Sequence, residues 1–98
     1  MAKQTYDALS IPPAARKQGG VEVLRAAIVH PNLALSLRRS FDDPRAWGVL
    51  LATVALQVAR IYATELGLDE EDTRARIRAA FESDLESPDD AGTITVVR

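Results

Sequence analysis

The sequence predicts a small α+β domain with three helices, a long buried central helix and a small antiparallel sheet. Apolar residues recur at helical spacing in two long stretches, residues 44–66 and 69–86, and in a shorter one, residues 21–30. Two other stretches resemble strands, because residues 33–40 alternate in polarity and residues 93–97 are all β-branched. Both periodicities in one short chain indicate the α+β class.

Length and composition limit what the chain can be. Its 98 residues hold one domain, since two independent cores would each be too small to fold. We expect residues 1–10 to form a flexible N-terminal arm and residues 11–98 a single compact α+β domain. The absence of cysteine excludes disulfides, thiolate zinc sites and cysteine nucleophiles.

The first twenty residues are expected to be largely extended. Prolines 12 and 13 favour polyproline or β geometry, and Gly19 and Gly20 break the chain before the next element. Residues 21–30 then form the short helix, with Leu24 and Ile28 on its apolar face. Pro31 ends this helix, because helical geometry is disfavoured in the residue before a proline.

The two predicted strands carry complementary patterns. Leu33, Leu35 and Leu37 lie on one face of the first strand, which is therefore half-buried. Residues 93–97 supply the second strand. Two strands alone are marginally stable, so they either pair beneath the helices or join equivalent strands of a second chain.

The central helix has clear start and stop signals. Asp43 suits the N-cap and Pro44 the first helical position, while Gly67 suits a left-handed C-cap. The third helix begins with a cap at Asp69 and runs to about residue 86 as an amphipathic helix laid against the central one.

The central helix is apolar on nearly all sides. Between Trp47 and Tyr62 only Thr53, Gln57 and Arg60 are polar, and at 100° per residue they fall within an arc of about 60°. An ordinary surface helix has an apolar face of little more than about 100°. The helix must therefore be covered on most sides, and the polar arc is its solvent-facing strip.

A chain of this size has too little material to cover such a helix by itself. We therefore expect a homodimer or a complex with another protein, in which the central helices pack against each other or the strands join. The function predicted on this basis is a non-enzymatic interaction or accessory module. The residues assigned to the interface, or to a pocket in the same place, are Trp47, Leu51, Val54, Val58 and Tyr62.

A basic cluster provides the alternative function. Arg38 and Arg39 end the first strand and Arg45 opens the central helix, so guanidinium groups could meet exposed backbone N–H groups there. This arrangement would bind a small anion or a nucleotide phosphate. We do not expect a nucleic-acid partner, because the net charge is −2 and no nucleic-acid-binding motif is present.

A third hypothesis, an enzyme, depends on His30 acting with Asp42 or Asp43 as an acid–base pair. A simpler interpretation places His30 at a helix end and Asp43 in a cap. We identify no catalytic constellation, no metal site, since a lone histidine supplies too few ligands, and no cofactor motif.

We expect a soluble, cytoplasmic protein without a membrane partner. The N-terminus lacks the apolar core of a secretory signal. In the central run Arg60 follows Trp47 by only 13 residues, whereas a spanning helix needs about 20 apolar residues.

Three segments of the chain resemble a small bacterial family of unknown function, DUF family 5076. These segments are IPPAA, GGVEVLRAAIV and LSLRRSFDDPRAWGVLLATVALQVARIYA, and the likeness extends over residues 11 to 85. The most specific part is the pattern DDP-x-x-WG-x-LL. The resemblance implies one compact domain and no known catalytic or binding residues.

Overall fold

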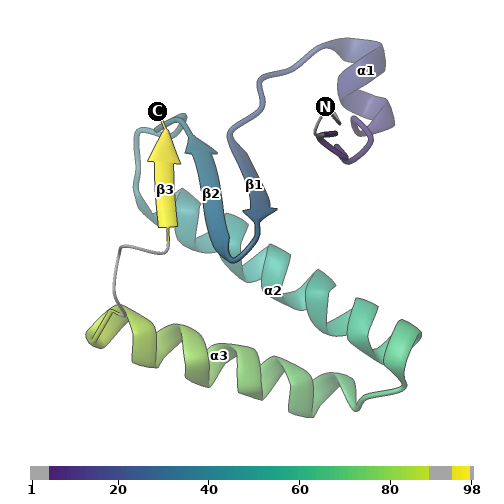
Figure 1. Ribbon diagram of the computed structural model, residues 1–98, viewed down its shortest axis with the longest axis vertical. Helices are drawn as coiled ribbons and strands as arrows, with labels where there is room; N and C mark the ends of the chain where they lie inside the picture. Colours follow the sequence, from purple (N-terminus) through teal and green to yellow (C-terminus); the bar gives the residue numbers. More distant parts are fainter. Residues whose placement is uncertain (1–4, 89–93, 98) are drawn as a thin grey trace, which may run out of the picture.

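The computed structural model describes residues 5–88 and 94–97, and its fold is α+β as predicted. Figure 1 shows a small sheet above a pair of long helices, with a short helix near the N-terminus. In chain order the elements are α1 (Pro13–Gln18), β1 (Leu24–Val29), β2 (Asn32–Leu37), α2 (Arg45–Leu66), α3 (Glu70–Glu86) and β3 (Ile94–Val97).

The sheet has three strands in the order β1-β2-β3. β1 and β2 pair antiparallel, whereas β2 and β3 pair parallel with Leu33 opposite Ile94. The two strands predicted from the sequence are therefore neighbours, but their pairing is parallel. The antiparallel neighbour of β2 is a strand that the sequence pattern did not indicate.

That strand corrects the helix expected over residues 21–30. Leu24 and Ile28 fit a helical face, but with Ala26 between them they also fit one face of a strand. His30 and Pro31 then form a two-residue turn with a cis peptide bond, as in type VI turns, and β2 follows directly. Pairing with an adjacent strand stabilises this segment more than one short helix with no partner would.

The N-terminal segment is less extended than expected. Pro13 begins α1, because a proline in the first turn loses no helical hydrogen bond, and Gly19 ends it with φ 82°. Before α1, the Tyr6 hydroxyl accepts a hydrogen bond of 2.9 Å from Nη1 of Arg25 on β1. Residues 1–4 of the predicted arm lie outside the described residues.

Both ends of α2 confirm the predicted signals. Asp43 Oδ1 accepts a hydrogen bond of 3.0 Å from the Arg45 backbone N–H, and Pro44 already has helical angles of −56° and −24°. At the other end Gly67 is left-handed with φ 70°, and its N–H donates to the Ala63 carbonyl at 3.1 Å.

α2 and α3 form an antiparallel pair. Ala59 of α2 and Thr73 of α3 are buried where the two helices pack closely. Asp69 caps α3 as predicted, since its Oδ2 accepts from the Asp72 N–H at 2.8 Å. The Arg60 Nε lies 3.6 Å from Oε2 of Glu70, so an ion pair joins the helices beside their connecting turn.

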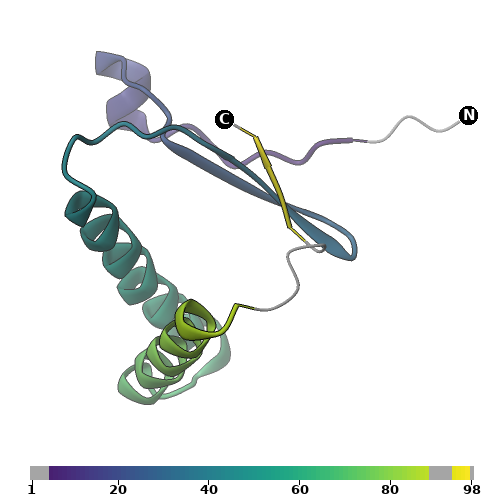
Figure 2. The same cartoon turned by 90° about the vertical axis from the view of Figure 1, so that its left-hand side faces the viewer.

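The expectation of a buried central helix is wrong for the single chain. Among the described residues of α2 only Ala59 is buried, and Val49 remains 67% exposed. The reason is that, among the elements the structure describes, only α3 packs along α2, while the sheet makes almost no contact with either helix. Figure 2 shows the sheet and the helical layer diverging as the two arms of an open V.

Gly48 lies inside α2 and Gly67 forms its C-cap, and replacing each with alanine is expected to change the stability in opposite directions. Gly67→Ala is expected to lower the free energy of unfolding by about 1 kcal/mol, because a Cβ is strained at φ 70° although nothing lies within 4 Å of it. Gly48→Ala is the control, inside the helix and also in open space, and should raise it by about 0.5–1 kcal/mol. Urea unfolding followed by circular dichroism measures both. A destabilised Gly48→Ala would show that this face is closely covered in solution.

Candidate functional site

The most prominent feature of α2 is an apolar stripe along its length. The stripe residues fall within an arc of about 100° on the helix, as coiled-coil contact positions do. Four of the stripe residues are exposed, whereas Trp47 and Val58 are half-buried. This α2 stripe consists of Trp47, Leu51, Val54, Val58, Ile61 and Tyr62.

The sheet presents a second apolar surface. Directly opposed residues of antiparallel strands project from the same face, and in this sheet the pairs on one face are all apolar. Ile28, at the hairpin end, is 81% exposed. This apolar sheet face consists of the pairs Leu24–Leu37, Ala26–Leu35 and Ile28–Leu33.

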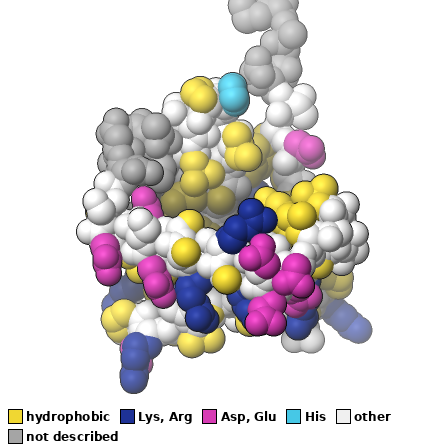
Figure 3. Space-filling model, turned by 90° about the horizontal axis from the view of Figure 1, so that it is seen from below, with side chains coloured by type: hydrophobic (Ala, Val, Ile, Leu, Met, Phe, Trp, Pro, Cys, Tyr) yellow, Lys and Arg dark blue, Asp and Glu magenta, His cyan; other side chains and the backbone are white. Residues whose placement is uncertain are grey.

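Between the sheet and the helical layer lies an open space, which we call the wedge. At its narrow end a hollow of about 390 Å³ is lined by Leu37, Arg38, Arg39 and Trp47. Figure 3 shows charged side chains over the helical layer and hydrophobic ones gathered in the recess between this layer and the sheet. The wedge is therefore apolar inside and charged outside, which is typical of a surface that another molecule covers.

Trp47 holds the two arms of the wedge together. Its indole Nε1–H donates to the Arg39 carbonyl at 2.8 Å, and its ring lies edge-on to Phe41 with centroids 5.5 Å apart. The same carbonyl accepts from the Phe41 N–H across Ser40, whose φ is 58°. The chain between β2 and α2 is thus a tight turn, and it fixes where α2 starts relative to the sheet.

The predicted anion-binding arginines are placed differently from one another. Arg38 and Arg39 both border the hollow beside Trp47. Arg45 instead pairs with Asp43, its Nη2 2.8 Å from Oδ2 and its Nε 3.0 Å from the same oxygen. The Arg45 guanidinium and N–H hold the pKa of Asp43 below its usual value. A carboxylate of the chain itself thus already occupies the guanidinium of Arg45.

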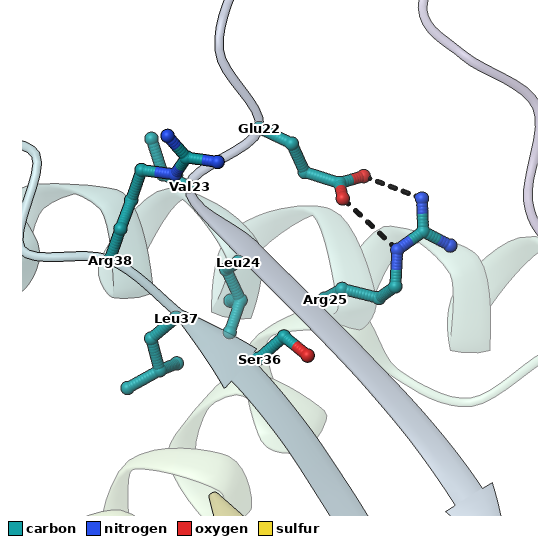
Figure 4. A pocket seen from close by; sticks show the side chains of 7 residues that line it. All are labelled: Glu22, Val23, Leu24, Arg25, Ser36, Leu37 and Arg38. Carbon is teal, nitrogen blue, oxygen red and sulfur yellow. Dashed lines mark hydrogen bonds and ion pairs between the residues drawn. The ribbon is translucent and has the colours of Figure 1, made fainter. Parts of the chain in front are cut away.

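A second hollow, of about 320 Å³, lies over the open end of the β1–β2 hairpin (Figure 4). Arg25 dominates it, with Nη2 2.8 Å from Oε2 of Glu22 and Nη1 bonded to the Tyr6 hydroxyl. The Tyr6 hydrogen bond and the Glu22 carboxylate both raise the pKa of Arg25. Because its charge is already balanced, we interpret this cluster as an anchor for the N-terminal segment. The i, i+3 spacing of Glu22 and Arg25 was its one signal in the sequence.

The residues of the enzyme hypothesis are not brought together. His30 lies in the turn at one end of β2, and Asp42 and Asp43 follow the other end. The six residues of β2 span about 20 Å at about 3.3 Å per residue. No proton can pass directly between these groups over that distance.

α2 also has the length and composition of a membrane-spanning helix, and it is the one such helix in residues 5–88 and 94–97. Its 22 residues exceed the apolar run counted from the sequence because the polar strip lies within it. The core helix of a soluble protein has the same length and composition, so this observation is weak evidence for a membrane.

The single chain exposes far more surface than a compact protein of its mass. Its accessible surface is 8907 Å², whereas about 5,500 Å² is expected for 10.7 kDa. Its radius of gyration is 15.8 Å, against about 12.5 Å for a compact chain of 98 residues. About 3,400 Å² of surface is therefore in excess, and the exposed large apolar side chains include four of the α2 stripe and Ile28 of the sheet face.

Comparison with known proteins gives a family and a related structure. The family model described as Domain of unknown function (DUF5076) matches residues 8–89. A solved structure from the photosynthetic bacterium Rhodopseudomonas palustrus, provisionally described as a pyruvate dehydrogenase, is 34% identical in sequence with a TM-score of 0.76. The similarity covers 93% of this chain and 95% of that one. None of the curated proteins is significantly similar.

Proposed function

We propose that this chain, which belongs to the DUF5076 family, is a non-enzymatic interaction module that works as a homodimer. The observation that carries the proposal is the excess of exposed surface, about 3,400 Å² above that of a compact chain. The exposed side chains include large apolar ones such as Val49, Val54 and Ile61, whose exposure to water is unfavourable unless a partner covers them.

A second copy is the partner that accounts best for the amount of surface. Obligate homodimers bury about 2,000–5,000 Å² in total, or about half of that from each chain. The excess on this chain is large enough to supply such an interface. Two-fold homodimers are also the commonest assemblies of soluble proteins, and a net charge of −2 causes little repulsion between copies.

A lipid bilayer fits the same surface less well. α3 packs along α2, so it would have to enter the bilayer together with α2. Among its 17 residues α3 carries nine acidic or basic side chains, and Arg60 of α2 pairs with Glu70. Each such group near the bilayer centre costs about 2.5–3.5 kcal/mol or more. We therefore propose a soluble protein.

The activity named for the related structure gives little support for an enzyme. Pyruvate oxidation requires groups that transfer protons and electrons around one carbon centre, and the candidate acid–base residues His30 and Asp42 lie at opposite ends of β2. Turnover of pyruvate by the purified chain alone would overturn the non-enzymatic part of the proposal.

Binding of a small anion or nucleotide phosphate is the alternative function. Its support is the position of Arg38 and Arg39 together at the hollow beside Trp47. Its weakness is that Arg45, the third member of the site, is neutralised by Asp43. Calorimetric titration with inorganic phosphate tests it: saturable binding that Arg39→Ala abolishes would favour this function.

The mass in solution tests the homodimer directly. Light scattering on a sizing column at two protein concentrations should give twice the chain mass of 10.7 kDa at both. A folded monomer at both concentrations would contradict the proposal, and the apolar surface would then need another cover. Addition of lipid vesicles to the column load distinguishes that cover, since a membrane protein would move to the void volume.

A further inference from the structure

We infer that the wedge of each chain is filled by α2 of the other, so that the two α2 helices cross antiparallel about a two-fold axis near Val54. Each α2 then lies between its own α3, the partner's α2 and the partner's apolar sheet face. The inference rests on the proposed homodimer and specifies which surfaces meet.

α2 has exposed apolar side chains on more than one side. Val54 and Ile61 belong to the stripe, whereas Val49 and Leu56 project about 170° away from its centre at 100° per residue. α3 covers the side of α2 that lies between the stripe and these two residues, around Ala59. A partner that touched the stripe alone would leave Val49 and Leu56 in water. Insertion of α2 into a wedge provides two further contact surfaces, one helical and one from the sheet.

The α2 stripe is itself symmetric about its middle. In an antiparallel crossing centred beside Val54, Leu51 faces Val58 of the other copy, and Trp47 faces Tyr62. Both pairs share one midpoint, between Val54 and Ala55 along the sequence. The stripe is therefore complementary to itself under a two-fold rotation, as an isologous interface requires. The stripe residues from Trp47 to Ile61 recur at alternating intervals of four and three, the spacing that allows knobs-into-holes packing between two helices.

Charge selects the antiparallel over the parallel arrangement. Arg38 and Arg39 lie near the start of α2, and the acidic first turn of α3, Glu70 to Asp72, lies near its end. An antiparallel crossing brings the arginines of one copy towards the acids of the other. A parallel crossing would place the two arginine clusters side by side, which is unfavourable.

Single-cysteine cross-linking tests the arrangement without interference, because the natural chain has no cysteine. Val54→Cys places a thiol on the two-fold axis opposite its own twin, within reach of a disulfide. Mild oxidation of the full chain should convert most of it to a covalent dimer on a non-reducing gel. The control, Thr53→Cys, lies on the polar strip and should remain uncross-linked.

A mixture of two variants tests the direction of the crossing. Leu51→Cys and Val58→Cys, mixed and allowed to exchange subunits, should cross-link to each other more than either does to itself. Stronger self-linkage of each variant would indicate parallel helices and overturn the inference. If scattering gives a dimer but Thr53→Cys links instead of Val54→Cys, the wedge is not the interface although the homodimer stands. A monomer by scattering would remove both.

Discussion

Replacing Val54 with arginine is expected to turn the dimer into monomers. In the proposed interface two copies of residue 54 meet at the symmetry axis, so one substitution buries two like charges next to each other. Burying an unpaired charge costs several kcal/mol, and each 1.4 kcal/mol is tenfold in affinity. We expect the dissociation constant to rise by about 1,000-fold or more. A dilution series on a sizing column with light scattering measures it.

The matched control for this prediction is Thr53→Arg. Thr53 is the preceding residue of the same helix, but it lies on the polar strip, and its hydroxyl only donates to the Val49 carbonyl at 2.9 Å. An arginine there should leave the dimer intact. Val54 is 45% exposed in the single chain, so its replacement need not disturb the chain fold itself. Equal loss of dimer in both variants would show that the charge acts on the helix generally and not at an interface.

The long helices could be predicted from the sequence because their signals are local. Asp43, Gly67 and Asp69 act on backbone groups within three or four residues, and the structure shows each of them in its predicted role. Side-chain pairing was less predictable. Glu70 lies four residues before Arg74, a spacing that favours an ion pair along α3, but it pairs with Arg60 across the helices. That choice depends on how α2 and α3 pack, which no local pattern contains.

β1 was missed because its sequence fits two periods. Leu24 and Ile28 are four residues apart, which suits a helix face as well as alternate positions of a strand. The deciding factor is the partner strand that follows the turn at Pro31, and its contribution is a tertiary one. For the same reason Pro31 was predicted to end a helix, whereas it lies in the turn of the β1–β2 hairpin.

The candidate site was predictable as a helix stripe but not as a wedge. Leu51, Val54 and Tyr62 could be chosen because an all-round apolar helix needs more cover than one short chain provides. The sequence could not show that the described part of the chain leaves this helix uncovered, since that depends on the angle between sheet and helices. This angle is set by the turn that joins β2 to α2, where Trp47 contacts Arg39 and Phe41.

The dependence of that angle on Trp47 leads to the second large expected effect. Trp47→Ala removes the edge-on contact with Phe41, the hydrogen bond to the Arg39 carbonyl and one wall of the hollow. We expect the free energy of unfolding to fall by about 3 kcal/mol, the lower end for the loss of a large aromatic side chain, because the ring is only half-buried. Urea unfolding followed by far-ultraviolet circular dichroism measures it, since the chain has no other tryptophan to serve as a fluorescent probe.

Trp47→Phe separates the two contributions of this side chain. Phenylalanine keeps an aromatic ring against Phe41 but cannot donate to the Arg39 carbonyl, so the expected loss is about 1 kcal/mol, close to that of one hydrogen bond. If the phenylalanine variant lost as much as the alanine variant, the hydrogen bond rather than the ring would hold the turn. If neither lost stability, the sheet and α2 would be held together by contacts between the two chains of the dimer, and the role assigned to Trp47 would be wrong.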